Sequence, residues 1–349
     1  MFPSWPMHRR GDPLSVLYLG LPAAAAGYCS LAIPGRPRPV WACRDKSRPV
    51  AIIAVLRPGG HVPGTEHDAM VAQRYAPATS GGQLMPGIVV HRPTSLPQYM
   101  ELIQTLQRKA GHSLWFRGNG RDQFKLVPTL YRHASKKSEN EHRKLELELM
   151  ARFRQRSIPY LTRDLREDWD ALFFMQHYGV PTRLLDWTEN PLVGLYFALM
   201  SSRSARSESS AIVWVLDPFV WNRTALSHLS YKDGPLTAGD QNLKGYVPAL
   251  PAGTAMGEFP VALYGAHNSA RIVAQRGVFT IFGANRKPME TLVESSDFPS
   301  SALSCIVVNH RRIASMRNSL LSQGTTETVV FPDLDGLARE TKRFFGFES

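Results

Sequence analysis

The sequence predicts an α+β fold, in which a mixed sheet with surrounding helices forms a single domain over residues 85–346. Three apolar runs, at 211–216, 277–282 and 303–308, have the length and composition of buried strands. Capped segments with helical spacing of apolar residues lie before and after them. Strands and helices do not alternate strictly, which favours the α+β class over a parallel βαβ sheet.

The domain is predicted to open with a helix and a strand. Ser95 can cap a helix in which apolar residues recur at helical spacing until Gly111 ends it. The run 113–118 is short, aromatic and bounded by glycine, which predicts a strand that leads into a tight turn.

A charged helix follows. Ser138 and Glu141 have the spacing of a capping box, and the helix should continue to about Arg154. Its expected apolar face carries Leu145, Leu149 and Phe153.

The middle of the domain is predicted to hold two more helices. One should span 164–178, with Gly179 as its C-cap. Residues 180–188 are expected to be irregular. Thr188 can then cap a helix over 189–202, which is apolar nearly all round and therefore belongs to the core.

The last part of the domain combines an expected insertion with two closing helices. Residues 228–268 hold many Gly, Pro and Asn and few periodic segments, which predicts a long surface insertion. Helices at about 311–323, stopped by Gly324, and at 333–345 complete the element list.

The first 84 residues are expected to contribute nothing to this core. They hold eleven of the 26 prolines. Neither the helical period of about 3.6 residues nor the strand period of about 2 residues continues for long in their apolar residues. This composition fits a disordered extension, or a start codon placed too far upstream, with Met85 as the true start. The apolar run at 14–33 follows three basic residues and also resembles a secretory signal. Pro22 within that run argues against a membrane-spanning helix.

Composition and short motifs narrow the function. The net charge of +12 favours contact with polyanions such as nucleotides or nucleic acid. Three cysteines, with no CxxC and no His/Cys cluster of ligand spacing, argue against a metal site and for a reducing, cytoplasmic compartment. The chain has no P-loop, GxGxxG, HExxH or GxSxG motif, which excludes the standard NTPases, dehydrogenases, metalloproteases and serine hydrolases.

The densest group of chemically active side chains lies at 176–188. It comprises His177, Tyr178, Arg183, Asp186, Trp187 and Thr188. Arg and His beside an aromatic ring would suit a phosphate and a stacked base. In the alternative interpretation this segment is a structural loop, in which Asp186 caps a helix and Arg183 pairs with it. Arg271 and Gln275 precede a strand and could face the same cleft.

Several segments together resemble the FRG domain, a bacterial family named for a tripeptide that stands here as Phe116-Arg117-Gly118. The similar segments are Leu114–Gly118, Leu126–Arg132, Gln176–Thr188, Asn190–Ala198, Ala274–Thr280 and Val330–Gly336. The resemblance covers about three quarters of the chain, and nothing in residues 1–84 matches it.

A more distant similarity links the Arg-Gly at the end of an early strand to ADP-ribosyltransferase folds. That similarity implies that Arg117 clamps a phosphate or ribose oxygen of NAD, and that Tyr178 or Trp187 stacks on the nicotinamide. The departure is that no Q-x-E or E-x-E motif follows. Glu258 and Glu290 are the isolated candidates for the missing carboxylate.

Two function classes therefore stay open. In the first, Arg117, His177 and Asp186 are catalytic residues of a nucleotide-handling enzyme, and Tyr178, Arg183, Trp187, Thr188 and Gln275 bind its ligand. In the second, the domain is a nucleic-acid-binding module without catalysis. No membrane partner is expected in either case. A shared site requires Arg117 to lie within hydrogen-bond reach of an acceptor in 176–188, about sixty residues along the chain.

Overall fold

The computed structural model describes residues 87–121, 123–135, 138–161, 164–165, 167–202, 209–266 and 269–347. The expected N-terminal extension lies outside these residues. All of them belong to one unit of the chain, which spans 64–349.

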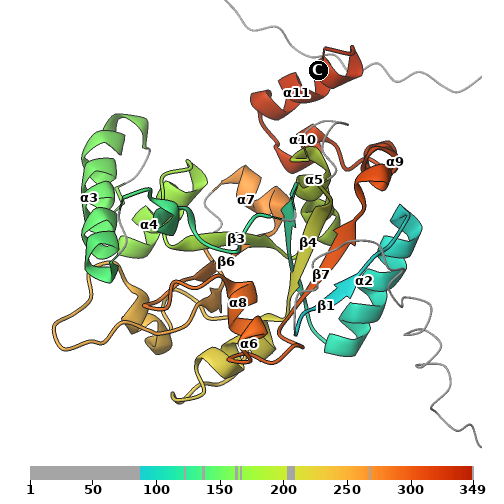
Figure 1. The fold of residues 1–349 in the computed structure, drawn as a ribbon. Coiled ribbons are helices and arrows are strands. Elements are labelled where there is room, and N and C mark those ends of the chain that lie inside the picture. The colour runs from blue at the N-terminus through green and yellow to red at the C-terminus, as the bar shows by residue number, and fades with distance from the viewer. Residues whose placement is uncertain are drawn as a thin grey trace, which may run out of the picture. The chain divides into compact units, whose positions relative to one another are not determined.

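Seven strands form one mixed sheet, in the order β1-β7-β4-β2-β3-β6-β5 (Figure 1). Their bounds are β1 Val89–His91, β2 Trp115–Asn119, β3 Leu184–Thr188, β4 Ala211–Leu216, β5 Val261–Leu263, β6 Gly277–Ile281 and β7 Leu303–Val308. β1 pairs with β7 in parallel, and every other pair of neighbouring strands is antiparallel. The predicted α+β class is thereby confirmed.

The helices pack around this sheet. Their bounds are α2 Leu96–Ala110, α3 Glu139–Ser157, α4 Asp168–His177, α5 Pro191–Met200, α6 Pro218–Ala225, α7 Ala270–Gln275, α8 Met289–Glu294, α9 His310–Ser322, α10 Glu327–Val330 and α11 Leu334–Phe344. Three 3-10 turns, η1 Thr129–Arg132, η2 Ile158–Tyr160 and η3 Gln241–Tyr246, lie between them.

Both faces of the sheet are covered, which explains the continuous apolar runs in the sequence. Along β4, Ile212 and Trp214 belong to one hydrophobic cluster, whereas Val213 and Val215 belong to a second cluster on the other face. The second cluster is built mainly with α2, α5 and α9, which gather beside β1, β7 and β4 in Figure 1. α3 and α4 lie at the other end, beside β3 and β6.

Local capping follows the sequence closely at the first helices. The Ser95 hydroxyl accepts from the Gln98 N–H at the start of α2, and Gly111 ends the helix with a left-handed φ of 74°. The expected capping box of Ser138 and Glu141 opens α3.

Three expectations about the middle of the chain were wrong. Residues 184–188 are not irregular but form β3, a central strand. The cap of α5 is Asn190, whose side chain accepts from the Leu192 N–H, while Thr188 is the last residue of β3. The segment 228–268 is not a surface insertion alone, because it supplies the edge strand β5 and buries Leu236 and Leu243 in the core.

Close packing of α5 on β2 explains the glycine of the FRG tripeptide. A Cβ atom at Gly118 would lie 2.1 Å from the carbonyl oxygen of Gly194 and 2.4 Å from the backbone nitrogen of Ala198. Neither backbone atom can move away without displacing α5, so only glycine fits at this position.

Candidate functional site

The candidate site lies where the sheet opens between β2 and β3. These two strands pair at a single position, Phe116 with Thr188, whereas β2 pairs with β4 at five positions and β3 pairs with β6 at five. Beyond Phe116 the two backbones therefore diverge. A cavity of about 280 Å3 lies at this divergence, and α4, α5 and α7 provide its other walls.

The cavity brings together most of the residues predicted to form a site. Its lining residues are Phe116, Arg117, Gly118, Gln176, His177, Asp186, Trp187, Thr188, Phe197, Ser201, Arg271, Ile272, Gln275, Gly277 and Phe279. Of the eight residues predicted from sequence, six are in this set, and Tyr178 and Arg183 are not.

Arg117 bridges the opening between the strands. Its Nη1 donates to the main-chain oxygen of Asp186 at 2.5 Å, and the same nitrogen lies 3.9 Å from the Asp186 carboxylate. This hydrogen bond confirms the expected proximity of the two motifs. The side chain keeps 22% of its surface exposed, so its remaining N–H groups can reach a ligand in the cavity. Burial lowers the pKa of Arg117, the Asp186 charge raises it, and the nearby Arg132 charge lowers it.

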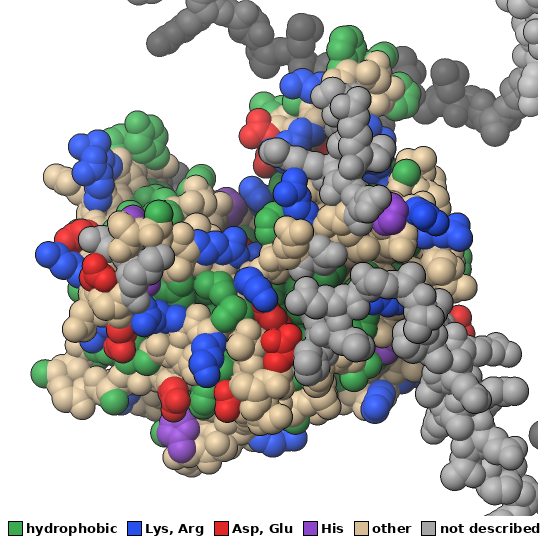
Figure 2. Space-filling model, in the orientation of Figure 1, with side chains coloured by type: hydrophobic (Ala, Val, Ile, Leu, Met, Phe, Trp, Pro, Cys, Tyr) green, Lys and Arg blue, Asp and Glu red, His purple; other side chains and the backbone are tan. Residues whose placement is uncertain are grey.

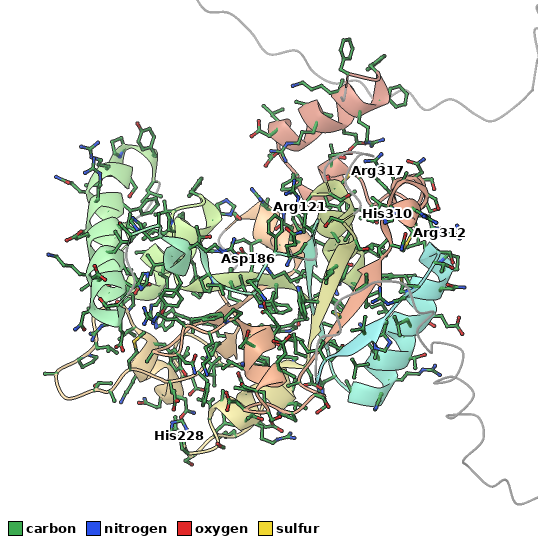
Figure 3. The ribbon with its side chains drawn as sticks, in the orientation of Figure 1. Arg121, Asp186, His228, His310, Arg312 and Arg317 are labelled. Carbon is green, nitrogen blue, oxygen red and sulfur yellow. The ribbon has the colours of Figure 1, made fainter. Side chains whose placement is uncertain are left out.

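Asp186 is the only carboxylate among the described residues that line the cavity, and its side chain is 56% exposed. Figure 3 labels it beside β3, in the middle of the displayed face. Its Oδ2 accepts from Gln176 Nε2 at 2.8 Å, and Thr182 Oγ1 donates to Gln176 Oε1 at 2.5 Å. Since the Asp186 carboxylate accepts from Gln176 Nε2, Gln176 Oε1 is the acceptor for the Thr182 hydroxyl, which itself accepts from the Leu184 N–H. The chain holds the Asp186 carboxylate in place and leaves its other oxygen open to the cavity.

His177 ends α4 and lines the cavity. Its Nδ1 lies 3.5 Å from the hydroxyl of Ser269, the cap of α7. Burial lowers the pKa of His177, and the Arg271 charge lowers it further, while Asp186 and Asp333 act in the opposite direction. The neutral imidazole is therefore favoured near neutral pH, and it can accept or donate a proton.

The base of the cavity is tied to the C-terminal elements. Thr188 Oγ1 donates to the Gln275 main-chain oxygen at 2.5 Å, and Gln275 Nε2 donates to the Val330 oxygen at 3.0 Å. Thr188 thus connects β3 to α7, and Gln275 connects α7 to α10. Both polar groups are engaged within the protein, which makes them supports of the site rather than free donors.

Arg271 supplies a second guanidinium to the cavity. Its Cζ lies 4.6 Å from the centre of the Phe331 ring, over which it stacks. Within the described part of the chain, Arg271 forms no hydrogen bond and no ion pair. Burial lowers the pKa of Arg271, while the Asp333 and Asp186 charges raise it. A cation that lines a cavity without a paired carboxylate is suited to an anionic ligand.

Arg183, predicted to bind a ligand, is instead part of the core. Its Nε lies 2.8 Å and 3.0 Å from the two oxygens of Glu146, and its other nitrogens donate to the main-chain oxygens of Phe282 and Tyr246. The two side chains are 2% and 1% exposed. Burial lowers the pKa of Arg183, but the Glu146 carboxylate, together with Tyr131 and Tyr246, raises it overall. The alternative pairing of Arg183 with Asp186 is also not observed.

The two aromatic residues expected to stack on a ligand are placed differently. Tyr178 is 65% exposed and does not line the cavity. Trp187 is 3% exposed, and its indole N–H donates to Thr280 Oγ1 at 3.1 Å, so it belongs to the core. Among the aromatic side chains of the lining, Phe197 is the one that is not fully buried.

Sequence reasoning assigned no role to Gln176 or Phe197. Gln176 is the first residue of the polar segment 176–188. Its side chain donates to Asp186, ten residues later, which lies on β3, and this strand was not expected. Phe197 lies within an apolar helix, where its spacing does not distinguish it from its core neighbours. Both roles become apparent only when β3 is known to be the second strand at the opening of the sheet.

Other acidic residues do not complete the site. Neither Glu258 nor Glu290 lines the cavity. Glu290 is buried, accepts from the Leu126 N–H at 3.1 Å, and has a pKa raised by its burial. In the part of the chain that the structure describes, no group of three His, Cys, Asp or Glu side chains could hold a metal ion. None of the described helices has both the length and the apolar character needed to cross a membrane.

Comparisons with known proteins identify one part of the chain. Residues 112–207 match the family model of the FRG domain. No curated protein and no solved structure matches the sequence. The matched residues include β2, α4, β3 and α5, which provide Arg117, His177, Asp186 and Phe197, whereas α7 and its Arg271 lie outside them. The chain therefore carries an FRG domain, and that domain forms four of the walls of the candidate site, those of β2, α4, β3 and α5.

Proposed function

We propose that the cavity binds a nucleotide, with a phosphate held by Arg117 and Arg271 and with Asp186 as the carboxylate that acts on the ligand. The observation that carries this proposal is the pair of guanidinium groups in one cavity, of which Arg271 has no ion pair or hydrogen bond among the described residues. Charge-assisted hydrogen bonds from such groups are the strongest that a protein offers to phosphate.

The size and lining of the cavity fit a small molecule. Its volume of about 280 Å3 is near the lower end of the roughly 300–1,000 Å3 that small-molecule sites span. Phe197 and Ile272 give it an apolar wall against which a base could pack. Polar groups that converge on a partly apolar cavity are typical of a ligand site.

Nucleic-acid binding without catalysis is supported less well. Figure 2 shows Lys and Arg side chains spread over the displayed face and mixed with Asp and Glu, rather than joined in one basic stripe. Arg312 and Arg317 belong to α9, and no residue of α9 lines the cavity (Figure 3). Three of the four aromatic side chains of the lining are buried, so they cannot stack on unpaired bases.

NAD is the nucleotide that gives Asp186 a defined task. In ADP-ribosyl transfer, the bond between the ribose C1′ and the nicotinamide nitrogen breaks, and nicotinamide leaves with the bonding electrons. An acceptor oxygen or nitrogen then bonds to C1′ and loses its proton. Asp186, half exposed and held by Gln176, could take that proton or stabilise the positive charge on the ribose. This role replaces the Glu that the sequence does not supply at the expected spacing.

A panel of ligands tests the proposed function on the full chain. The thermal midpoint is measured with AMP, CMP, GMP, UMP, ADP, NAD and a single-stranded oligonucleotide. A nucleotide at 100 times its Kd adds about 2.7 kcal/mol of stability, which corresponds to a rise of about 5–10 °C for a domain of this size. Arg271→Gln should abolish the rise, whereas Arg311→Gln, an exposed residue of α9, should leave it unchanged. A rise with the oligonucleotide alone would contradict the proposal and favour the binding module.

We expect nucleotide affinity to increase as the pH falls from 8 towards 6, through His177. The free protein favours the neutral imidazole, since burial and Arg271 lower the His177 pKa from its ordinary value of 6.5. A bound phosphate raises that pKa, so protonation and anion binding strengthen each other. The measurement is Kd against pH for NAD, whose phosphates do not titrate in this range. His177→Asn should flatten the profile, and equal slopes in the two proteins would exclude His177 from the site.

A further inference from the structure

One aromatic ring holds two guanidinium groups beside the cavity. Phe331, which follows α10, is 8% exposed. The Cζ atom of Arg271 on α7 lies 4.6 Å from its ring centre, and the Cζ atom of Arg339 on α11 lies 4.9 Å from it. Stacking on a ring fixes the plane of a guanidinium but leaves its N–H edges free to donate. Two such edges therefore lie beside one ring.

Neither cation is neutralised by the protein. Within the described residues, Arg339 and Arg271 form no ion pair and no hydrogen bond, and each is held by its ring contact. Arg343, four residues further along the same helix, differs because its Nε and Nη2 each donate to a Glu327 oxygen at 2.8 Å. The nearby Asp333 carboxylate is engaged as the cap of α11, where its Oδ1 accepts from the Gly336 N–H at 2.7 Å.

The two cations are close enough to repel each other. After burial and the opposing Asp333 and Asp186 charges, Arg339 is among the causes that lower the pKa of Arg271. The Asp333 and Asp186 charges oppose this repulsion on Arg271, and a bound anion lowers the energy of the two cations further. Arg271 and Arg339, which form a cluster around Phe331, are thus better suited to an anion together than either cation is alone.

The cluster is continuous with the candidate site. Arg271 lines the cavity, and so does Phe197, whose ring packs edge-on against Phe331 at 5.9 Å. Gln275, also in the lining, donates to the Val330 oxygen and so fixes the residue before Phe331. A ligand that occupies the cavity near Arg117 and Arg271 can therefore extend past Phe331 to Arg339.

We infer that Arg271 and Arg339 form a second phosphate subsite, so that the ligand carries two linked phosphates rather than one. The inference rests on the proposed nucleotide function and deepens it to nucleoside diphosphates and their esters. It also places a determinant of ligand choice on α7 and α11, outside the residues that match the FRG family model.

Affinities for AMP and ADP, measured by calorimetry on the full chain, test the second subsite. The wild-type protein should bind ADP at least ten times more tightly than AMP. Arg339→Gln should weaken ADP binding by about tenfold, the loss of one charge-assisted contact, and should leave AMP binding unchanged. Lys342→Gln removes the same charge from the same helix without touching Phe331, and it should change neither affinity.

The remaining outcomes each have one meaning. Equal affinity for AMP and ADP, or equal weakening by Arg339→Gln and Lys342→Gln, would overturn the second subsite while the proposed function stands. Tighter binding of an oligoadenylate than of ADP, lost in Arg339→Gln, would also overturn it, because successive phosphodiesters would then fill the cluster. Absence of binding by AMP, by ADP and by every other nucleotide of the thermal panel to the wild-type protein would remove the proposed function itself. An unchanged thermal midpoint of Arg339→Gln is the control for folding, and Arg339→Lys repeats the test with the charge kept.

Discussion

Replacing Arg183 with Met should destabilise the domain more than any other single change considered for it. The substitution leaves the Glu146 carboxylate buried without a cation and leaves the main-chain oxygens of Tyr246 and Phe282 without their donors. Breaking a buried ion pair in this way costs about 3–5 kcal/mol. Since whole domains are stable by only about 5–15 kcal/mol, we expect a large loss of folded protein at 37 °C.

Urea denaturation followed by circular dichroism measures this loss. Lys144→Met is the matched control, because Lys144 lies on the same helix α3 that carries Glu146 and pairs with Glu148 at 3.9 Å, but the two side chains are 79% and 61% exposed. Its cost should stay near the roughly 0–1 kcal/mol of surface pairs. The double variant Glu146→Leu/Arg183→Met removes both buried charges and should be more stable than Arg183→Met alone. Additive losses in the double variant would show that the two charges do not stabilise each other.

The same pair explains why β3 could not be predicted. A strand covered on both faces is expected to be apolar, as β4 and β7 are, and both of these were predicted within a residue of their bounds. β3 instead has Arg183 before it and Asp186 within it. Arg183 is neutralised by a residue 37 positions earlier, and Asp186 points into the opening of the sheet. Both facts are tertiary, so a local pattern could not reveal them.

The partner of Arg183 was hidden for a related reason. On α3, the expected apolar face was Leu145, Leu149 and Phe153, of which Leu149 and Phe153 pack against the core, but the fully buried side chains are His142, Glu146, Met150 and Ser157. A Glu in a charged helix is ordinarily solvated. The burial of Glu146 depends on its ion pair with Arg183, and nothing in the local sequence indicates that these two residues are neighbours.

The short elements were also beyond sequence reasoning. β1 and β5 have three residues each, which is too few for a period of two to be recognised. β5 follows a stretch of Gly and Pro that looks like surface loop, yet Leu236 and Tyr246 from this stretch are 2% exposed. Long-range packing on α6 and β6 makes these residues part of the core.

The part of the site that lies in the two sequence motifs could be predicted. The FRG tripeptide and the segment 176–188 each held exposed polar groups beside glycine or apolar residues, and their proximity was expected and found. Arg271 was noticed as a residue that could face the cleft, but nothing local distinguished it from a solvated Arg. Its contact with Phe331, sixty residues later, is what keeps it in the cavity wall.

Arg117→Ala should leave the domain folded and abolish nucleotide binding. The side chain is 22% exposed at the edge of a cavity, and among the described residues its one hydrogen bond is to the main-chain oxygen of Asp186. Loss of that charge-assisted bond costs about 1.5–3 kcal/mol, which a domain stable by about 5–15 kcal/mol tolerates. The loss in binding is larger, because a guanidinium can donate two hydrogen bonds to one phosphate, each worth about 1.5–3 kcal/mol. We therefore expect at least a hundredfold weaker binding.

Arg117→Lys separates binding from architecture. Lysine keeps the charge but lacks the planar pair of donors that a phosphate or carboxylate accepts, so this variant should stay folded and retain a little of the wild-type affinity. Arg132→Ala is the matched control, because Arg132 lies near Arg117 but donates to the Val127 oxygen and does not line the cavity. It should bind as the wild type does. If Arg117→Ala is unfolded while Arg117→Lys is folded and binds fully, then Arg117 serves only to join β2 to β3 across the opening of the sheet. The cavity would then lose its first cation, and Arg271 alone would have to hold the phosphate.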